Sequence, residues 1–447
     1  MILKDNSKYS SSSSDVEEFL SLQNIANRKI SDLLTENKKL LIYPHSFVQC
    51  EDRIEEQHLF SLHTHWVGKQ CTQVSLETGN IVGFISVKGK PISIYSRFTP
   101  EAKGDLFLHY LLNRVLNIHI VNLPHGTANE QIFNFLLYLF PKHLNDALSQ
   151  GIYKEYKNNE YNNANLRGTI NICKHIRTNL PFNGNIAYHA REFSHDNHIT
   201  ELIRHTIEYI NTTRHGRSLL DNNADTKANV EKILAATPHY NRNERSRIIK
   251  LNSKIFYHPY YSSYAPLQKL CLKILRHERI KYGHQENFIY GVLFDVSYLW
   301  EEYLAKILTR IGFCHPHNKT RTNPIYLAQS NKLPRYPDFY RGEENSIIVD
   351  AKYKKEINRD DIHQMLAYMY RLKGTIGIFI KPTEKSPSYQ YWENSYSLLG
   401  YGKDKHAELK TFCFPIPQET INYHQFEVAM ADTEKTLKSL SLKLFKL

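Results

Sequence analysis

The spacing of apolar and polar residues divides the beginning of the 447-residue chain into a tail, a helix and a β-rich region. Residues 1–14 end in a run of serines and are expected to form a disordered tail. Ser14 and Glu17 have the spacing of a capping box, which predicts a helix from about Asp15 to about Glu36. From Leu40 to about Pro100, short β-like runs alternate with turn residues, which indicates a small β-rich domain.

Turn residues inside the β-rich region predict how its strands connect. Gly79-Asn80 and Lys88-Gly89-Lys90 are each expected to close a hairpin between two neighbouring strands. The expected strands are residues 39–43, 71–75, 81–87 and 91–95.

The middle of the chain has helical spacing, interrupted once by a polar stretch. Lys154 to Asn165 is rich in Asn and Tyr and is expected to be a loop. Leu267, Leu270, Cys271 and Ile274 recur as the apolar stripe that a helix buries. The expected helical segments are residues 105–116, 131–140, 197–212 and 229–275.

The last third of the chain, from about Ile289, has a different order of elements. A helix from Val296 to Leu308 is followed by two extended runs, a helix from Arg359 to Leu372 and a buried strand beginning at Thr375. This succession predicts a mixed sheet with helices on its faces. The whole chain is therefore expected to be a multidomain α+β protein. The predicted divisions are a tail at 1–14, a β-rich domain at 15–130, a mostly helical region at 131–285 and an α/β domain at 286–447.

Composition narrows the class of protein. The chain carries 57 Lys and Arg against 45 Asp and Glu, a formal net charge of +12, which favours nucleic acid as a partner. Six cysteines lie far apart without a Cys-x-x-Cys pair, as in reduced cytoplasmic proteins. No run of eighteen apolar residues occurs, so a membrane span is not expected, and the start of the chain does not resemble a secretory signal.

Two aspartates and a lysine in the last third carry the strongest chemical signal. Asp338 precedes an extended run, and the turn formers Gly342 and Asn345 separate that run from the strand that contains Asp350 and Lys352. A hairpin would bring Asp338 and Asp350 together, and side-chain alternation puts Asp350 and Lys352 on one face. Two such carboxylates repel one another unless a divalent cation lies between them. Mg²⁺ prefers oxygen ligands and retains water, and Lys352 can orient that water or stabilise charge on a phosphate. The pattern predicts a phosphodiesterase site.

Pro337-Asp338 followed by Asp350-x-Lys352 resembles the core of the PD-(D/E)xK nucleases, which have a restriction-endonuclease-like fold. Gln364 and Tyr368 lie four residues apart on the next helix and resemble the Gln-x-x-x-Tyr motif of the RecB-like branch. The resemblance also implies a glutamate ligand on the preceding helix. Glu301 is chosen on the resemblance alone, because the helical wheel does not separate it from Glu302.

Several segments occur in a characteristic order along the chain. They are Leu166-Arg-Gly-Thr-Ile170, Glu192-Phe-Ser-His-Asp196 with Glu201-Leu-Ile203, the helix from Phe294 to Tyr303, Tyr336-Pro-Asp338 and Val349-Asp-Ala-Lys-Tyr353. Their order resembles the McrC family, the nuclease subunit of McrBC-type restriction systems, and in particular its LlaJI-like members. The resemblance spans roughly residues 80–440 and is strongest in the last third.

The resemblance implies an Mg²⁺-dependent endonuclease of antiviral defence that cuts double-stranded DNA together with an McrB-like AAA+ GTPase. GTP would be bound by that partner, in agreement with the absence of a Gly-x-x-x-x-Gly-Lys-Ser/Thr loop from this sequence. Residues 15–130 are then expected to form the partner-docking domain. Deletion of residues 1 to about 130 is expected to abolish stimulation of the partner's GTPase and to leave a folded nuclease domain.

Two weaker candidates remain beside this reading. A basic stretch followed by tyrosines 257, 260, 261 and 264 suits DNA contact, or equally a solvated helix face followed by a packed loop. Its basic residues are Arg242, Arg245, Arg247 and Lys250. Cys314, His315 and His317 are spaced closely enough to suggest zinc, but a loop is the better interpretation because no second ligand cluster accompanies them.

Two alternative functions also remain open. One is a RecB-like nuclease that works without a motor, and the other is a non-catalytic assembly or DNA-binding factor that retains the fold.

Overall fold

The structure is a computed structural model of the full chain, and it is divided into two compact units. Unit 1 comprises residues 1–132 and 285–447, and unit 2 comprises residues 133–284. The description below covers all residues except 12–15, 38–39, 47–55, 68–69, 88–89, 100–103, 117–127, 214–215, 222, 281–288, 317–322, 343–345, 386–390, 400–406, 421 and 445–447. Ser14 of the predicted capping box and the turn residues Lys88 and Gly89 therefore lie outside the described residues.

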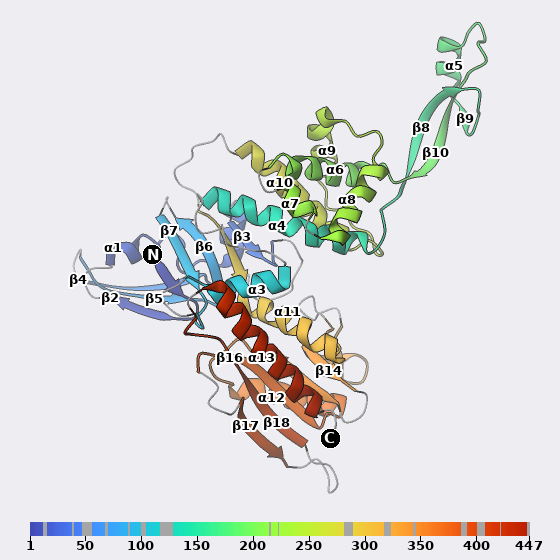
Figure 1. Cartoon of the computed structure of the whole chain (residues 1–447). Coiled ribbons are helices and arrows are strands. Elements are labelled where there is room, and N and C mark those ends of the chain that lie inside the picture. The colour runs from blue at the N-terminus through green and yellow to red at the C-terminus, as the bar shows by residue number, and fades with distance from the viewer. Residues whose placement is uncertain are drawn as a thin grey trace. The chain divides into compact units, whose positions relative to one another are not determined.

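Unit 1 contains a five-stranded sheet in the order β1-β7-β6-β11-β3 (Figure 1). Four of its strands come from the first hundred residues, and β6 and β7 form the antiparallel hairpin predicted around Lys90. The strands are β1 (Ile2–Lys4), β3 (Leu40–Tyr43), β6 (Ile81–Val87), β7 (Lys90–Tyr95) and β11 (Tyr290–Asp295).

Strand β11 follows unit 2 in the sequence, yet it belongs to this N-terminal sheet. It pairs antiparallel with β6 and parallel with β3, so the predicted boundary at residue 286 precedes a strand of the N-terminal sheet. The pairing requires glycine: a Cβ at Gly291 would lie 2.3 Å from Phe84 O, and one at Gly83 would lie 2.3 Å from Val292 O. In the structure, the N-terminal region up to residue 130 therefore shares a sheet with the last third of the chain and is not a separate domain.

A second, three-stranded sheet in the order β2-β5-β4 packs against the first around a common apolar core. Its strands are β2 (Lys8–Ser11), β4 (Phe60–Val67) and β5 (Gln70–Thr78). The expected disordered tail is wrong for residues 2–11, because β1 pairs with β7, β2 pairs with β5, and Leu3 is buried. Gly79-Asn80 does not close a hairpin, because β5 and β6 belong to different sheets.

The predicted helix over residues 15–36 is two short helices, α1 (Val16–Leu20) and α2 (Ile30–Glu36), joined by turns. Asn27 lies between them with φ 60°, a left-handed conformation that cannot continue a helix. Its side chain donates to Leu62 O and accepts from Leu62 N, which holds the break against β4.

The remaining part of unit 1 is a second five-stranded sheet in the order β14-β15-β16-β18-β17. The predicted order of strand, strand, helix and strand is present as β14, β15, α12 and β16. The strands are β14 (Phe339–Arg341), β15 (Ile347–Ala351), β16 (Ile376–Thr383), β17 (Trp392–Leu398) and β18 (Ala407–Pro415), and a two-stranded β12 (Ile325–Ala328) and β13 (Lys332–Arg335) ribbon precedes them.

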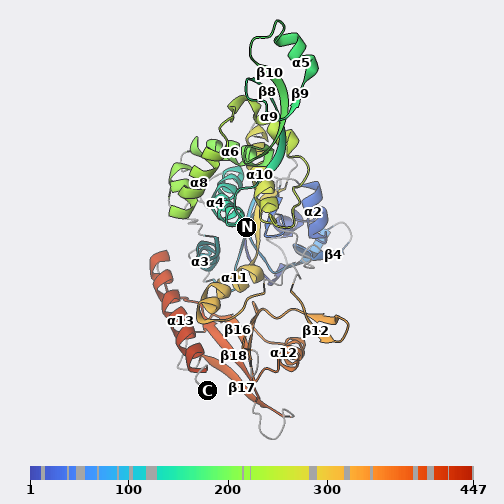
Figure 2. The same ribbon diagram turned by 90° about the vertical axis from the view of Figure 1, so that its right-hand side faces the viewer.

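Helices cover both faces of this sheet, as Figure 2 shows for α12 (Arg359–Leu372) and α13 (Tyr423–Leu444) on either side of β16 and β18. On one face, Ile348, Phe379 and Leu409 pack against Met365 and Tyr368 of α12. The opposite face meets α11 (Val296–Leu308), whose Trp300 contacts Phe414 and donates to Ile380 O. A 3-10 turn, η4 (Thr309–Ile311), ends α11 at Gly312.

A buried polar cluster joins α11 and α13 to α3 (Leu106–Leu116), the first helix after the N-terminal sheet. The Glu434 carboxylate accepts hydrogen bonds from Tyr110 at 2.7 Å, Tyr303 at 3.0 Å and Arg114 at 2.6 Å. A buried carboxylate of this kind is stable only while its donors are present. The N-terminal and C-terminal parts of unit 1 therefore depend on one another.

Unit 2 is mostly helical, as expected for residues 131–285, but it also contains a three-stranded sheet. The helices are α4 (Ala128–Leu148), α5 (Ile172–Thr178), α6 (His198–Asn211), α7 (Gly216–Asp221), α8 (Ala224–Ala236), α9 (Arg245–Leu251) and α10 (Tyr264–Ile280), with a 3-10 turn η3 (Arg242–Glu244). None of the described helices is long and apolar enough to cross a bilayer.

The predicted polar loop at residues 154–165 is wrong, because Glu155–Asn163 is a strand. This β8 pairs antiparallel with β10 (Ile186–Ser194), which also pairs with β9 (Thr169–Ile170). Neither face of β8 is buried in a core, so the strand lacks the apolar alternation that sequence patterns detect. Cross-strand ring pairs stabilise it instead, including Tyr156 with Phe193 at 4.8 Å.

Candidate active site

The two aspartates meet where β14 begins and β15 ends. Phe339 pairs with Val349, and continuing this register by one residue places Asp338 opposite Asp350. Asp338 Oδ2 also accepts a hydrogen bond from Ala351 N at 2.8 Å, which fixes its carboxylate beside β15. Gly342 has φ 89° and supplies the left-handed conformation at the start of the connection. Asn345, the second predicted turn former, lies outside the described residues.

Lys352 lies on the same side of the chain as Asp350. Its ammonium is 2.7 Å from Asp350 Oδ2 and 3.5 Å from Asp361 Oδ1, and the Asp350 side chain is 2% exposed. Burial alone lowers the pKa of Lys352, but the charges of Asp350 and Asp338 outweigh burial and raise this pKa above its usual value. Lys352 therefore carries a proton and stands as a fixed positive charge at the site.

Helix α12 brings Gln364 and Tyr368 to the same place, as their spacing predicted. Gln364 Oε1 accepts from the Lys352 ammonium at 2.9 Å, and Gln364 Nε2 donates to the Tyr368 hydroxyl at 2.6 Å. Tyr368 in turn donates to Tyr336 O at 2.9 Å, two residues before Asp338. Asn358 caps the helix in a capping box with Asp361, which fixes where α12 begins. One chain of hydrogen bonds therefore joins Lys352 to the segment just before Asp338, by way of Gln364 and Tyr368.

The structure separates Glu301 from Glu302, which the sequence did not. Glu301 is 8% exposed on α11, and its charge acts on Asp338. Burial, followed by the charges of Glu301 and Asp350, raises the pKa of Asp338 well above its usual value. Glu302 is more exposed, and its carboxylate lies 3.5 Å from His315 Nε2. Glu301 is thus the glutamate that belongs to the group of buried carboxylates.

His315 is a site residue that the sequence interpretation placed in an ordinary loop. Its Nδ1 lies 3.0 Å from Asp338 O, and its Nε2 faces Glu302 at 3.5 Å and Glu301 at 4.0 Å. The ring stacks on Phe339 with centroids 4.7 Å apart. Its neighbour Cys314 forms a β-bridge with Tyr340, which carries His315 to the aspartate. From the sequence, His315 was only a candidate zinc ligand together with Cys314 and His317, and His317 lies outside the described residues.

The buried carboxylates fit a hard divalent cation by their chemistry. Asp338, Asp350 and Glu301 supply only oxygen donors, and the charges of Glu301 and Asp350 add to burial in raising the pKa of Asp338. Across the described part of the chain, however, no three His, Cys, Asp or Glu side chains stand close enough to hold one ion.

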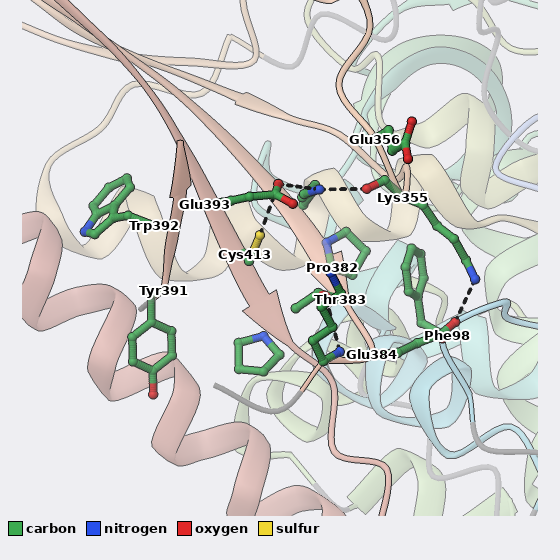
Figure 3. Close-up of a pocket in the computed structure, with 13 residues that line it drawn as sticks. Phe98, Lys355, Glu356, Pro382, Thr383, Glu384, Tyr391, Trp392, Glu393 and Cys413 are labelled. Atoms are coloured by element: carbon green, nitrogen blue, oxygen red, sulfur yellow. Dashed lines mark hydrogen bonds and ion pairs between the residues drawn. The ribbon is translucent and has the colours of Figure 1, made fainter. Parts of the chain in front are cut away.

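A cavity of about 520 Å³ opens beside the segment that follows Lys352 (Figure 3). The nearly buried Lys381 ammonium lies in it, 2.6 Å from Glu393 Oε2 and 2.7 Å from Lys355 O. Phe98, Trp392 and Cys413 also line it. The cavity holds as many lysines as glutamates, namely Lys355, Lys381 and Lys385 with Glu356, Glu384 and Glu393, so it has no net charge to attract an anion.

The predicted DNA-contacting residues belong to unit 2, not to unit 1. Arg242 lies in η3, and Arg245, Arg247 and Lys250 lie in α9. The Arg245 guanidinium packs over the Tyr209 ring at 4.9 Å, and Arg247 is paired with Glu244. Of the tyrosines that follow, Tyr264 is buried in the core, whereas Tyr257 and Tyr260 are exposed.

Comparisons with known proteins find one matching family model and several similar solved structures. The family model described as McrBC 5-methylcytosine restriction system component matches residues 76–380. A chain in the refined half-complex from the tetradecameric assembly of Thermococcus gammatolerans McrB AAA+ hexamers with bound McrC is similar at 14% identity. That match covers 98% of this chain and 99% of the other, with a TM-score of 0.46. A chain of the Thermococcus gammatolerans McrBC complex is similar at 17% identity, over 69% and 87% of the two chains, with a TM-score of 0.29. No curated protein sequence matches.

Proposed function

The chain belongs to the family of McrBC 5-methylcytosine restriction system components, and from this premise we propose that it is the nuclease subunit of a GTP-driven restriction complex. The proposed activity is Mg²⁺-dependent hydrolysis of phosphodiester bonds in double-stranded DNA by a PD-(D/E)xK site. We further propose that the subunit is McrC-type, of the LlaJI-like branch, and that it stimulates a partner AAA+ GTPase.

One observation carries the proposal: the residues of both motif halves converge on the end of β15. The Lys352 ammonium contacts Asp350 at 2.7 Å and Gln364 at 2.9 Å, while the hydrogen-bonded chain from Gln364 through Tyr368 returns to the residues before Asp338. A structural ion pair needs only one acid and one base. Three buried carboxylates, a protonated lysine and an oriented glutamine exceed that need, which favours a catalytic site.

The residues have separate tasks in hydrolysis. A divalent cation held by Asp338, Asp350 and Glu301 would polarise the phosphate and lower the pKa of a bound water. Lys352 donates to a non-bridging phosphate oxygen and stabilises the charge that grows there as water oxygen bonds to phosphorus and the ester oxygen leaves. Gln364 keeps the ammonium pointed at the phosphate, and burial keeps these charges strong. His315 holds the backbone of Asp338.

The partner in this proposal is the source of GTP hydrolysis. The sequence contains no Gly-x-x-x-x-Gly-Lys-Ser/Thr loop, so a chain in a GTP-driven system must act on nucleotide bound elsewhere. Among the described residues of 15–130, which are expected to dock the partner, Trp66 is the only large hydrophobic side chain that is exposed.

Unit 2 offers a better docking surface on the ribbon of β8, β9 and β10 with α5. Large apolar side chains are exposed along these elements: Tyr156, Leu166, Ile170, Ile172, Ile176, Leu180, Phe182 and Phe193. Apolar surface that a protein leaves exposed, where it is contiguous, marks contact sites for other proteins. We therefore propose the AAA+ partner as their occupant, with residues 15–130 as the competing location.

The function is tested with purified chain, partner GTPase, GTP, Mg²⁺ and plasmid DNA. Cleavage that requires all five supports the proposal, whereas cleavage without partner and GTP identifies a motor-independent nuclease. No cleavage under any condition, with intact stimulation of GTP turnover, identifies a non-catalytic factor.

The docking surface is tested separately by GTP turnover of the partner. Ile172→Ser, at a side chain 66% exposed on α5, is expected to abolish stimulation. Ile255→Ser is the matched control, because Ile255 is 62% exposed in the same unit but outside the ribbon. Equal stimulation by both variants would move the docking site to residues 15–130.

A further inference from the structure

Tyr353 directly follows Lys352, yet its side chain is buried among residues of the N-terminal segment. The Tyr353 hydroxyl lies 2.7 Å from Ser96 Oγ, and its ring meets the edge of Phe98 with centroids 5.1 Å apart. Strand β15 ends at Ala351, so the sheet ladder does not hold Tyr353. The loop that follows β7 therefore holds Tyr353, and through it the segment of chain that carries Lys352.

Arg97 forms the centre of this anchor. Its guanidinium lies over the Tyr353 ring at 4.9 Å, a distance suited to a cation–π contact. The same guanidinium donates to Asp5 Oδ2 from Nη2 at 2.6 Å and from Nε at 3.0 Å, and Arg97 N donates to Asp5 Oδ1. Asp5 is fully buried. This geometry orients the guanidinium plane, because two of its nitrogens donate to the same carboxylate oxygen, Asp5 Oδ2.

A second carboxylate holds the loop from the other side. Asp105 accepts from Ser96 N at 2.6 Å, from Thr99 Oγ1 at 2.5 Å and from Leu108 N at 2.8 Å. The last of these bonds joins the loop to the first turn of α3. Ser96, Arg97 and Phe98 thus lie between the carboxylates of Asp5 and Asp105, and residues of the N-terminal part of unit 1 determine their positions.

From these contacts we propose that Tyr353, Arg97 and Asp5 are positioning residues for Lys352. Successive side chains of an extended chain point to opposite sides, so a fixed Tyr353 on one side fixes the direction of Lys352 on the other. Lys352 N also donates to Ile380 O at 3.0 Å, so the residue is held by its backbone and by its neighbour. This inference rests on the proposed function of Lys352.

The proposal has a consequence that simple packing does not have. If the anchor only stabilised the fold, its loss would lower the unfolding temperature and leave the turnover of folded protein unchanged. If the anchor positions Lys352, its loss lowers kcat in protein that is still folded and still binds DNA. Misplacing a catalytic group by about 1 Å costs on the order of 100-fold in rate, so even a partial shift is measurable.

The test compares Tyr353→Phe and Asp5→Asn with Tyr110→Phe. Tyr353→Phe removes one hydroxyl, and Asp5→Asn removes one charge at nearly constant shape. Tyr110→Phe is the matched control, since its buried hydroxyl donates to Glu434 at 2.7 Å within the same unit but does not touch the site. With partner, GTP and Mg²⁺, we expect kcat to fall by about tenfold or more in the first two variants. The KM for DNA is expected to stay the same, and the control is expected to keep both values.

Three outcomes decide the proposal. A drop in kcat with unchanged KM in both anchor variants, against an unchanged control, supports it. Equal kcat in wild type, Tyr353→Phe and Asp5→Asn overturns it. Ser96→Ala, which removes only the partner of the Tyr353 hydroxyl, replaces either variant that does not fold and is judged by the same criterion.

A crystal structure of Tyr353→Phe separates this proposal from the proposed function. If wild-type protein does not cleave DNA, the nuclease assignment fails, but the position of the Lys352 ammonium still answers the question. Displacement from its place 2.7 Å from Asp350 supports a positioning role, and an unmoved lysine overturns it.

Discussion

The Lys352 ammonium lies 2.9 Å from Gln364 Oε1, so a lysine at the end of a strand is oriented by a glutamine on the following helix. The lysine contacts a neutral acceptor, Gln364, in addition to the Asp350 carboxylate. The Gln364 amide is in turn oriented by its hydrogen bond to Tyr368. This arrangement makes separate predictions for the acid, the base and the residue that orients it.

Asp350→Asn is expected to lower DNA cleavage by about 1,000-fold or more, because the substitution removes a charged oxygen donor from the buried group. The fold should persist, since Lys352 keeps Asp361 and Gln364 as partners. Cleavage assays and circular dichroism of the same preparation measure both effects. Near-normal cleavage by the folded variant would remove Asp350 from the catalytic set.

Lys352→Ala should abolish cleavage and preserve Mg²⁺ binding, because the ammonium acts on phosphate and not on the metal. Removing a positive charge from beside Asp350 is expected to leave metal affinity unchanged or to increase it. Calorimetric titration of both proteins with Mg²⁺ provides the measurement. A loss of affinity as large as that of Asp338→Ala would show that the lysine has another role.

Gln364→Ala should reduce kcat by about 10- to 100-fold without changing DNA affinity, since it frees the ammonium but leaves its charge in place. Tyr368→Phe should have a smaller effect, because Gln364 then loses one of its two contacts. Steady-state kinetics of the two variants test this order. The reverse order of severity would mean that Tyr368 acts directly on the site.

His315→Ala is expected to weaken Mg²⁺ binding by about 10- to 100-fold, as losses of groups that hold metal ligands commonly do. The ring supports Asp338 through its carbonyl and faces both glutamates of α11. His239→Ala is a suitable control, because His239 contacts Asp196 in unit 2 and its side chain is 87% exposed. Equal Mg²⁺ affinities in the two variants would show that His315 is only a packing residue.

Unit 2 should lose stability as the pH falls from about 6.5 towards 4. Burial lowers the pKa of His205 to about 4 and that of His143 to about 3, both below the ordinary value of about 6.5. In this interval the unfolded chain takes up protons that the folded unit excludes, so the contribution of His205 falls by about 2 kcal/mol at pH 5. Hydrogen exchange of residues 133–284 at several pH values measures it. His205→Phe keeps a ring beside Tyr240 and should show a flatter pH dependence than wild type.

Deletion of residues 1–130 should leave a poorly folded fragment, contrary to the expectation from the sequence. Strand β11 would lose its neighbours β6 and β3, and the Glu434 carboxylate would lose Tyr110 and Arg114. Circular dichroism and limited proteolysis of the remaining fragment measure the outcome. A fragment that unfolds cooperatively and resists protease would restore the separable domain.

The helices of unit 1 near the site could be predicted because their apolar spacing is regular and unbroken. Val296–Leu308 and Arg359–Leu372 match the predicted bounds, since Asp295 caps one helix and Asn358 the other. The hairpin between Asp338 and Asp350 could be predicted because side-chain alternation fixes which residues share a face.

Other features depend on contacts that no local pattern records. The sequence of β11 is an apolar run, and no pattern near it indicates that β3 and β6 are its neighbours in the sheet. His315 lies at the site because Cys314 forms a bridge with Tyr340 and the His315 ring stacks on Phe339. Residues 155–163 form a strand without a buried face, so their polar sequence resembled a loop.

The order of strands in the N-terminal sheet also sets an order of events during synthesis. Among the described strands, β3 pairs only with β11, which leaves the ribosome about 250 residues later. Residues 40–43 therefore lack this sheet neighbour for most of translation. Unit 2 is continuous in sequence and can complete its fold in that interval. The sheet of strands β14 to β18 is synthesised last. The strands that would carry the proposed catalytic residues are therefore made only after β11 has become available to close the first sheet.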